Sequence, residues 1–279
     1  MKRRGRPIGI NLRNLPPFSI NIHTETDIYI SRAIEDTGVW EGFETRVIVE
    51  LLAYFGQFID IGANIGWYSV LAGHALAGKG HVLSFEPDPR NFELLEHNVH
   101  ANHLHNVKLF NVALADTKGE RILYRSADNL GDHRLYAEGS EGREAVRVAT
   151  TTFNAAVSPH LQGPCLVKMD TQGSETMILE GMSDYLHANS KNVVLIIEFW
   201  PYGLKNAGTS AAALIDKLSR LNMNVWLVDE VLCTVKATTF EELIERAQSD
   251  LAPQTQGFAN LLLIPSGHPA QRVVESLCV

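Results

Sequence analysis

Residues 58–66, Phe58-Ile59-Asp60-Ile61-Gly62-Ala63-Asn64-Ile65-Gly66, predict an apolar strand that ends at an acid and passes through a glycine-spaced turn into a helix. In a G-x-G-x-x-G loop the second glycine lets the backbone approach a pyrophosphate, but Asn64 holds that place here. Asp60 puts a negative charge where a pyrophosphate would be repelled. That charge suits an amino-acid ammonium, and the helix N-terminus suits the carboxylate of the same ligand. The stretch therefore predicts an amino acid joined to a nucleoside, which is S-adenosylmethionine.

Composition sets the outer limits of these expectations. A chain of 279 residues with 45% hydrophobic content can bury a large core, which favours one domain with additions over two. The net charge of −8 argues against a broad nucleic-acid footprint, so we expect no nucleic-acid partner. Apolar runs stay well short of the roughly 18 residues that a membrane span needs, so we expect no membrane partner.

Cysteine usage and the first residues predict a cytoplasmic protein. Cys165, Cys233 and Cys278 are widely spaced and form no C-x-x-C pair, which disfavours a disulfide framework or a zinc cluster and suits a reducing compartment. The basic residues 2–4 are not followed by the apolar stretch of an export signal. Residues 4–7, Arg-Gly-Arg-Pro, resemble the core of a minor-groove AT-hook, but we interpret them as a solvated, poorly ordered tail.

Hydrophobic periodicity predicts an alternation of strands and helices. After an irregular segment to about residue 25, two helical pieces are expected with a break near Thr37-Gly38. Asp88-Pro89 has the form of a helix N-cap followed by proline at the first helical position. This alternation is typical of βαβ units and a parallel sheet. The expected strands are 56–60, 81–86, 107–114, 165–170, 193–198, about 225–228 and 258–264, and the other expected helices are 65–77, 211–221 and 240–247.

A polar segment interrupts this rhythm. Residues 116–142 are rich in Gly, Asp, Arg and Ser, with short strands expected at 120–124 and 143–150, and such an insertion is either a functional loop or disorder. We therefore divide the chain into an N-terminal tail and helical extension, 1–55, packed on a core domain, 56–279, which carries a substrate-loop insertion at about 116–150.

Acids follow several of the expected strands, namely Asp60, Glu86, Asp170 and Glu198. In open α/β sheets, ligands bind outside the carboxyl ends of the strands where the strand order reverses. Glu86 lies 24 residues after Gly62, close to the spacing of an acid that accepts hydrogen bonds from ribose hydroxyls. The alternative is a solvated turn residue before Pro87.

Four ordered segments together resemble the motifs of the FkbM family of S-adenosylmethionine-dependent methyltransferases. They are Phe58–Gly66, Ser84–Pro87, Asn111–Leu114 and Val167–Glu175, and the resemblance covers about residues 26–200. It implies an α/β, Rossmann-like class I methyltransferase fold: a seven-stranded, mostly parallel sheet with helices on both faces and an antiparallel last strand. It also implies methyl transfer to hydroxyl groups, often on natural products or surface sugars. Two residues depart from the family pattern: Gln172, where Glu is usual, and Asn154, where Asp is common.

Roles in cofactor binding follow from the motifs and the chemistry. Transfer of a methyl group from a sulfonium to oxygen needs an in-line nucleophile and a base that removes its proton. We expect Asp170 to face the methionine ammonium or the acceptor hydroxyl, the alternative being a helix cap. S-adenosylhomocysteine would be the product. The other expected cofactor residues are Asp60, Gly62, Asn64 and Gly66 for the methionine part, Glu86 and Pro87 for the ribose, and Asn111, Val112 and Ala113 for the adenine.

The polar insertion and the end of strand 193–198 supply the candidates for catalysis and acceptor binding. His133 is our candidate general base beside Asp132 and Arg134, and the alternative is a surface histidine in a mobile loop. Glu198, Trp200 and Tyr202 are expected to form an acceptor wall, unless Phe199 and Trp200 only cover the sheet edge. No metal site is predicted, although Mg²⁺ between Asp170 and Glu198 stays open. The candidate catalytic residues are His133 and Asp170. The candidate substrate residues are Asp132, Arg134, Glu198, Trp200 and Tyr202.

The sequence thus predicts an S-adenosylmethionine-dependent O-methyltransferase acting on a hydroxyl of a small molecule, such as a sugar, a glycan or a polyketide-type natural product. A non-catalytic domain that has kept the fold is one alternative. An NAD-dependent oxidoreductase is another, which Asp60 and Asn64 oppose. The identity of the acceptor and the presence of a homo-oligomer stay open.

Overall fold

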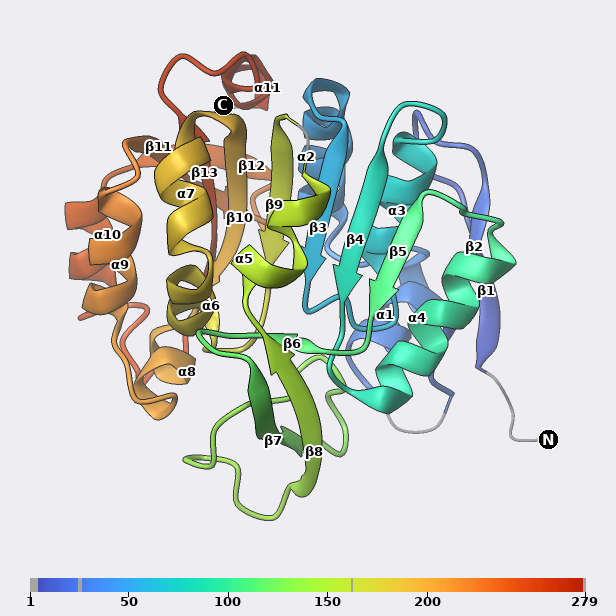
Figure 1. Ribbon diagram of the computed structural model, residues 1–279, viewed down its shortest axis with the longest axis horizontal. Coiled ribbons are helices and arrows are strands. Elements are labelled where there is room, and N and C mark those ends of the chain that lie inside the picture. Colours follow the sequence, from blue (N-terminus) through green and yellow to red (C-terminus); the bar gives the residue numbers. More distant parts are fainter. Residues whose placement is uncertain (1–4, 25–26, 162, 278–279) are drawn as a thin grey trace.

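A computed structural model describes residues 5–24, 27–161 and 163–277 (Figure 1). Its main sheet has eight strands in the order β12-β11-β13-β10-β9-β3-β4-β5. The strands β3, β4, β5, β9 and β10 are parallel, whereas β13 runs antiparallel to both β10 and β11. The bounds are β3 Gln57–Ile61, β4 His81–Phe85, β5 Val107–Phe110, β9 Cys165–Met169, β10 Val193–Phe199, β11 Met223–Asp229, β12 Thr234–Thr238 and β13 Ala259–Pro265.

This topology confirms the expected class I methyltransferase sheet and its antiparallel last strand. The seven expected strands are present, and β12 adds an eighth at the edge by pairing with β11. The strand order reverses between β3 and β9, where the chain returns to the middle of the sheet. The carboxyl ends of β3, β4 and β9 therefore meet at the point where ligands bind in this class of sheet.

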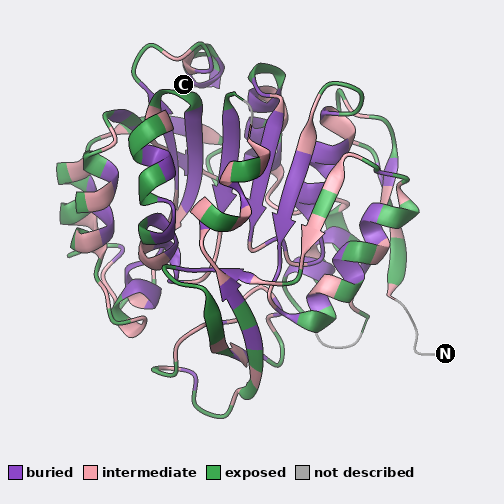
Figure 2. Ribbon diagram, in the orientation of Figure 1, coloured by how far each residue is buried: buried purple, intermediate pink, exposed green. Residues whose placement is uncertain are grey.

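Helices cover both faces of the sheet, and alternate residues of each strand enter the two cores (Figure 1). In β3, Phe58 enters one core and Ile59 the other, because neighbouring side chains of a strand point to opposite faces. Figure 2 shows the buried strands of the main sheet and the exposed outer faces of the helices. One core includes helices α1 Ile30–Thr37, α2 Gly42–Leu51, α3 Trp67–Ala75, α4 Pro89–Ala101 and α11 Gln271–Leu277; the other includes α5 Phe153–Ala156, α6 Glu175–Gly181, α7 Ser183–Asn189, α8 Pro201–Asn206, α9 Ala211–Ser219 and α10 Phe240–Arg246.

The helix boundaries follow local signals in the sequence. Asp88 is the N-cap of α4: its carboxylate accepts hydrogen bonds from the backbone N–H groups of Arg90 and Asn91, and Pro89 opens the helix. Gly38 ends α1 in the left-handed region, with φ of 76°, as glycine does at helix C-termini. Both predictions are confirmed.

The N-terminal segment differs from the expectation of an irregular tail. Strands β1 Arg6–Ile10 and β2 Phe18–Ile22 form an antiparallel hairpin that packs beside α4. Ile20 is fully buried, and the Asn21 backbone N–H donates to Oδ1 of Asn98 in α4 at 2.7 Å. The prediction of a loose tail is thus wrong for Arg6 and Pro7, while residues 1–4 lie outside the described residues.

The polar insertion is built on a second, three-stranded sheet at the carboxyl ends of the parallel strands, at the bottom of Figure 1. Its strands are β6 Ala113–Leu114, β7 Gly119–Arg125 and β8 Glu144–Thr151. The prediction of a single strand at 107–114 is therefore wrong. The chain leaves the main sheet after β5, and β6 pairs with β8 instead. Residues 126–143 connect β7 to β8 and lie over the same edge of the main sheet.

Among the residues that the structure describes, none of the helices combines the length and apolar character that a bilayer crossing requires. Cys165 is a buried free thiol and Cys233 an exposed one, whereas Cys278 lies outside the described residues.

Candidate functional site

The turn after β3 requires glycine at its first position. Gly62 has φ of +84°, and a Cβ atom there would lie 2.0 Å from the backbone oxygen of Asp170. Its N–H and that of Ala63 both donate to the carbonyl of Phe85 at 3.0 Å, which ties the turn to the end of β4. Gly66, with φ of +91°, brings the start of α3 against Leu95 of α4. The glycine spacing therefore sets the distance between three elements at the site.

The side chain of Asn64 makes a hydrogen bond that glycine could not make. It occupies the left-handed region with φ of 51°, which asparagine tolerates better than most residues. Its backbone N–H donates to Oε2 of Glu86 at 2.8 Å, and its side-chain amide donates to the carbonyl of Leu130 in the insertion at 2.8 Å. Asn64 thus links the turn to both the acid after β4 and the loop above it.

Glu86 is a buried acid, which excludes the alternative of a solvated turn residue. Its side chain is held by the backbone N–H groups of Asn64 and Asp88, each at 2.8 Å. Burial raises the pKa of Glu86 to about 8, and these hydrogen bonds oppose the increase only in part. At neutral pH the carboxyl group is therefore largely protonated, and at the edge of the cavity it can form hydrogen bonds with a polar ligand.

These groups surround a cavity of about 60 Å³ between the ends of β3, β4 and β9 and the insertion. Three of the predicted cofactor residues do not line it: Asp60, Gly66 and Asn111. The Asn111 amide instead donates to the carbonyls of Glu86 and Pro87 at 2.8 and 3.1 Å. The predicted residues that do line the cavity are Gly62, Asn64, Glu86, Pro87, Val112, Ala113, His133 and Asp170.

Asp60 lies below this cavity, inside β3. Its carboxylate accepts a hydrogen bond from Oγ of Ser69 in α3 at 2.6 Å. Burial raises the pKa of Asp60 to about 6, while Ser69 and Lys168 act to lower it. Its position suits an acid that supports the turn from beneath, and its contribution to cofactor affinity stays a prediction.

Lys168 is the centre of a buried charge cluster that the sequence did not assign. Its Nζ atom lies 3.0 Å from Oε1 of Glu44, 3.5 Å from Oδ2 of Asp170 and 3.8 Å from Oε2 of Glu41. Burial acts to lower the pKa of Lys168, but these acids raise it well above its usual range. The Tyr68 hydroxyl donates to Glu41 at 2.7 Å. A lysine inside an otherwise apolar strand was the signal available in the sequence, because such a charge needs partners.

Asp170 and Glu198 lie side by side at the ends of β9 and β10. Both accept hydrogen bonds from Nε2 of Gln172, at 2.9 Å for Asp170 and at 3.1 and 3.2 Å for the two oxygens of Glu198. Burial raises the pKa of Glu198 well above its usual range, and Asp170 and Glu175 add to the increase. Across the part of the chain that the structure describes, no group of three or more His, Cys, Asp or Glu side chains has the arrangement of a metal site.

His133 lies at the edge of the cavity with its side chain only 8% exposed, so it is not an exposed surface histidine. Its Nδ1 atom accepts a hydrogen bond from the backbone N–H of Ser126 at 3.2 Å, so the neutral ring carries its proton on Nε2, which lies 4.0 Å from Oδ2 of Asp88. Burial lowers the pKa of His133 to about 4. The ring is therefore neutral at physiological pH, with its free lone pair already in use.

The predicted acceptor residues of the insertion and of α8 contact one another. The guanidinium of Arg134 binds Asp132, with Nε 2.7 Å from Oδ1, and lies 5.1 Å from the ring centroid of Trp200 and 5.8 Å from that of Tyr202. Trp200 is buried and donates through Nε1 to the carbonyl of Gln256 at 3.2 Å. Asp132, Arg134, Trp200 and Tyr202 thus form one cluster, and none of the four lines the small cavity.

Asn154, the second departure noted in the sequence, lies away from this site. Its amide donates to Oδ2 of Asp184 at 3.1 Å and its oxygen accepts from the backbone N–H of Tyr185 at 3.2 Å. It therefore joins α5 to α7.

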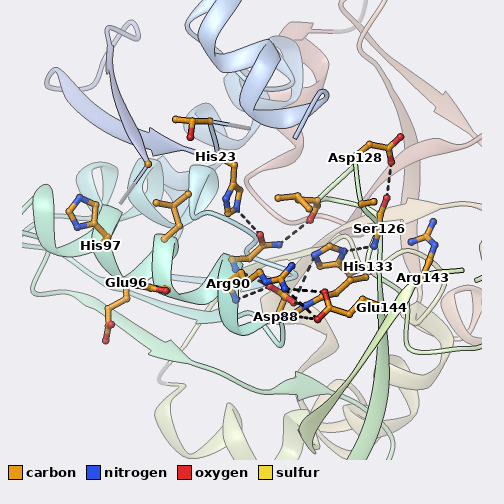
Figure 3. A pocket seen from close by; sticks show the side chains of 18 of the residues that line it. His23, Asp88, Arg90, Glu96, His97, Ser126, Asp128, His133, Arg143 and Glu144 are labelled. Carbon is orange, nitrogen blue, oxygen red and sulfur yellow. Dashed lines mark hydrogen bonds and ion pairs between the residues drawn. The ribbon is translucent and has the colours of Figure 1, made fainter. Parts of the chain in front are cut away.

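A larger cavity of about 1100 Å³ adjoins the small one (Figure 3). It opens between His23 after β2, the start of α4 at Asp88 and Arg90, and the insertion from Ser126 to Glu144. Asn91, Leu130 and His133 line both cavities and so form the wall between them. The Asn91 and Asn64 amides both donate to the Leu130 carbonyl, which holds this wall in place.

The chain is similar to several methyltransferases. The chain is 29% identical over 140 residues to the hexuronic acid methyltransferase AglP of Haloferax volcanii, a match that covers 49% of this chain and 53% of AglP, so the chain spans about half the length of this curated relative. Among solved structures, methyltransferase FkbM from Methylobacillus flagellatus aligns with a TM-score of 0.44 and 16% identity, covering 75% of this chain and 43% of that one. A TehB-like SAM-dependent methyltransferase from Corynebacterium glutamicum aligns with a TM-score of 0.44 and 10% identity, covering 84% and 94% of the two chains.

The match to a family model is more extensive. The methyltransferase FkbM domain matches residues 60–224, which is more than half of the chain and includes the turn after β3, Glu86, the insertion and the end of β9. The chain therefore belongs to the FkbM methyltransferase domain family.

Proposed function

We propose that this chain is an S-adenosylmethionine-dependent O-methyltransferase that acts on a hydroxyl group of a small molecule, with sugars and glycans as the first class to test. The observation that carries the proposal is the cavity at the strand-order reversal, where the glycine turn, Glu86 and Asp170 converge. The name of the relative AglP supports a sugar acceptor.

The residues at the cavity fit this cofactor in their chemistry. Gly62 lets the turn lie directly against Asp170 at the edge of the cavity. Glu86 offers a carboxyl group for the ribose hydroxyls, and Asp170 offers one for the ammonium or the acceptor hydroxyl. Val112 and Ala113 add an apolar edge for the adenine. Asp60 and Gly66 would support the turn, and Asn111 would fix the backbone of Glu86 and Pro87.

The cavity is smaller than this cofactor needs. Sites for ligands of such size measure about 300–1000 Å³, against about 60 Å³ here. Leu130 and its neighbours in the wall must therefore move toward the larger cavity when the cofactor binds. Truncating the wall by Leu130→Ala should speed association of S-adenosylhomocysteine in stopped-flow fluorescence, and an unchanged rate would contradict this movement.

The transfer requires a base next to the acceptor. When bound, S-adenosylmethionine supplies an electrophilic methyl group. Asp170 is the preferred base, because it lines the cavity and keeps a partly exposed carboxylate, 27% accessible, beside the other acids. His133 is the second candidate, but its Nδ1 lone pair already accepts a hydrogen bond. Glu198, Trp200, Tyr202, Asp132 and Arg134 would shape the acceptor side.

Two experiments test the proposal. Thermal-shift assays with S-adenosylmethionine, S-adenosylhomocysteine and NAD should show stabilisation by the first two only, because Asp60 and Asn64 oppose a pyrophosphate. Transfer of a labelled methyl group to glucuronic acid, or to a panel of sugars and polyketide alcohols, would then establish catalysis. Binding without transfer to any acceptor would favour a non-catalytic domain, and stabilisation by NAD alone would favour an oxidoreductase. Parallel reactions with a chelator would decide whether Mg²⁺ assists.

A further inference from the structure

We propose that Gln172 is a positioning residue of the site: its side-chain amide holds Asp170 and Glu198 together as one carboxylate pair, and its backbone carbonyl ties this pair to the polar insertion through Tyr136. The inference rests on the proposed function, because it concerns the acids that would meet the cofactor ammonium and the acceptor hydroxyl. It adds a residue to which neither a cofactor contact nor a catalytic role was assigned.

The first part of the inference rests on three hydrogen bonds from one nitrogen. Nε2 of Gln172 lies 2.9 Å from Oδ1 of Asp170 and 3.1–3.2 Å from both oxygens of Glu198. An amide NH₂ group has two hydrogens and can therefore serve both acids at once. The amide occupies the place between two carboxylates where a shared cation or a shared proton would otherwise be needed.

The charges around Asp170 and Glu198 explain why a hydrogen-bond donor stabilises this pair. Among the described residues of this charge cluster, Lys168 is the single cation. It is already shared among three acids, Glu41, Glu44 and Asp170. With so many acids near one cation, any donor to the pair favours its ionised form. The acids that face Asp170 or Glu198 from the neighbouring elements are Glu41 before α2, Asp60 in β3 and Glu175 at the start of α6, with Glu44 of α2 behind Lys168.

The second part rests on the backbone of Gln172. The residue lies in the left-handed region, with φ of 54°, which turns its carbonyl toward the insertion. That carbonyl accepts a hydrogen bond from the Tyr136 hydroxyl at 2.8 Å. Tyr136 in turn lies beside Arg134, whose guanidinium is 5.9 Å from its ring centroid. A displacement of the insertion would thus be transmitted to the carboxylate pair through Gln172.

The pH dependence of S-adenosylhomocysteine affinity tests the role, because the ligand ammonium should bind the ionised pair. Titration calorimetry from pH 5 to pH 9 would compare the wild type with Gln172→Ala and Gln172→Glu. Without the amide, Glu198 should hold its proton to a higher pH, and we expect the midpoint of the affinity-against-pH curve to rise by about one pH unit in Gln172→Ala. It should rise further in Gln172→Glu, which has nearly the same shape but adds a third acid.

Tyr136→Phe is the matched control. It removes the hydroxyl that binds the Gln172 carbonyl and leaves the side-chain amide, so the midpoint should equal that of the wild type, while loss of the tie to the insertion should lower the affinity equally at every pH. A purely structural role for Gln172 would weaken binding equally at every pH. Equal midpoints in the wild type and in both Gln172 variants would overturn the inference. Failure of the wild type to bind S-adenosylhomocysteine at any pH would instead overturn the proposed function.

Discussion

The replacement Gly62→Ala tests whether the turn after β3 must be as close to β9 as the structure indicates. A Cβ atom would lie 2.0 Å from the Asp170 carbonyl oxygen, whereas ordinary contact begins at 3.4 Å. Relief would need a shift of about 1.4 Å between two central strands of the sheet, which costs about 1–3 kcal/mol as overpacking. The left-handed φ of +84° adds about 1 kcal/mol for any residue with a side chain. We therefore expect a loss of about 2–4 kcal/mol in the free energy of unfolding.

Gly78→Ala is the matched control for this prediction. Gly78 has φ of +73°, and a Cβ atom there would meet no atom within 4 Å, so only the backbone strain of about 1 kcal/mol applies. Urea denaturation of both variants gives the difference, and calorimetry with S-adenosylhomocysteine measures whether only Gly62→Ala loses affinity. Equal stability of the two variants would refute the close approach of the turn to Asp170.

Three further predictions concern the buried ionisable groups. Because burial raises the pKa of Glu86 to about 8, its protonated form stabilises the fold at low pH, and this contribution, at most about 5 kcal/mol, is lost as pH rises from the ordinary pKa of 4.5 through 8. Glu86→Gln should therefore have a flatter pH dependence of stability between pH 5 and pH 9 in urea denaturation, and an unchanged slope would contradict this. Lys168→Met should cost about 3–5 kcal/mol because it leaves the fully buried Glu44 without its cation, and Glu44→Gln in the same chain should recover much of the loss; additive losses in the double-mutant cycle would contradict the pairing. His133→Ala should keep its affinity for S-adenosylhomocysteine; a fall in turnover of about 10²–10⁴-fold would assign the base to His133, and near-normal turnover would leave Asp170 in that role.

The order of the elements and the cofactor motifs could be predicted because their signals are local. The glycine turn, the Asp88 N-cap and the acids after the strands each depend on a few neighbouring residues. Parallel strands then bring distant acids to one edge of the sheet as a consequence of topology.

The features that the sequence did not reveal depend on contacts between distant segments. Lys168 finds its partners in Glu41 and Glu44, more than a hundred residues earlier in the chain. The β1–β2 hairpin has strands of only five residues and becomes stable by packing on α4 and its neighbours. Strand β12 has a single buried residue, Val235, which is too weak a pattern to detect.

Calorimetric titration of S-adenosylmethionine into the wild type and into Glu86→Ala tests the central claim most directly, with Asp60→Ala as a second variant and NAD as a second ligand. We expect the wild type to bind S-adenosylmethionine and not NAD, and both variants to lose this affinity, because Glu86 faces the cavity and Asp60 supports the turn from beneath. Unchanged affinity in both variants, or binding of NAD in place of S-adenosylmethionine, would contradict the assignment of this site.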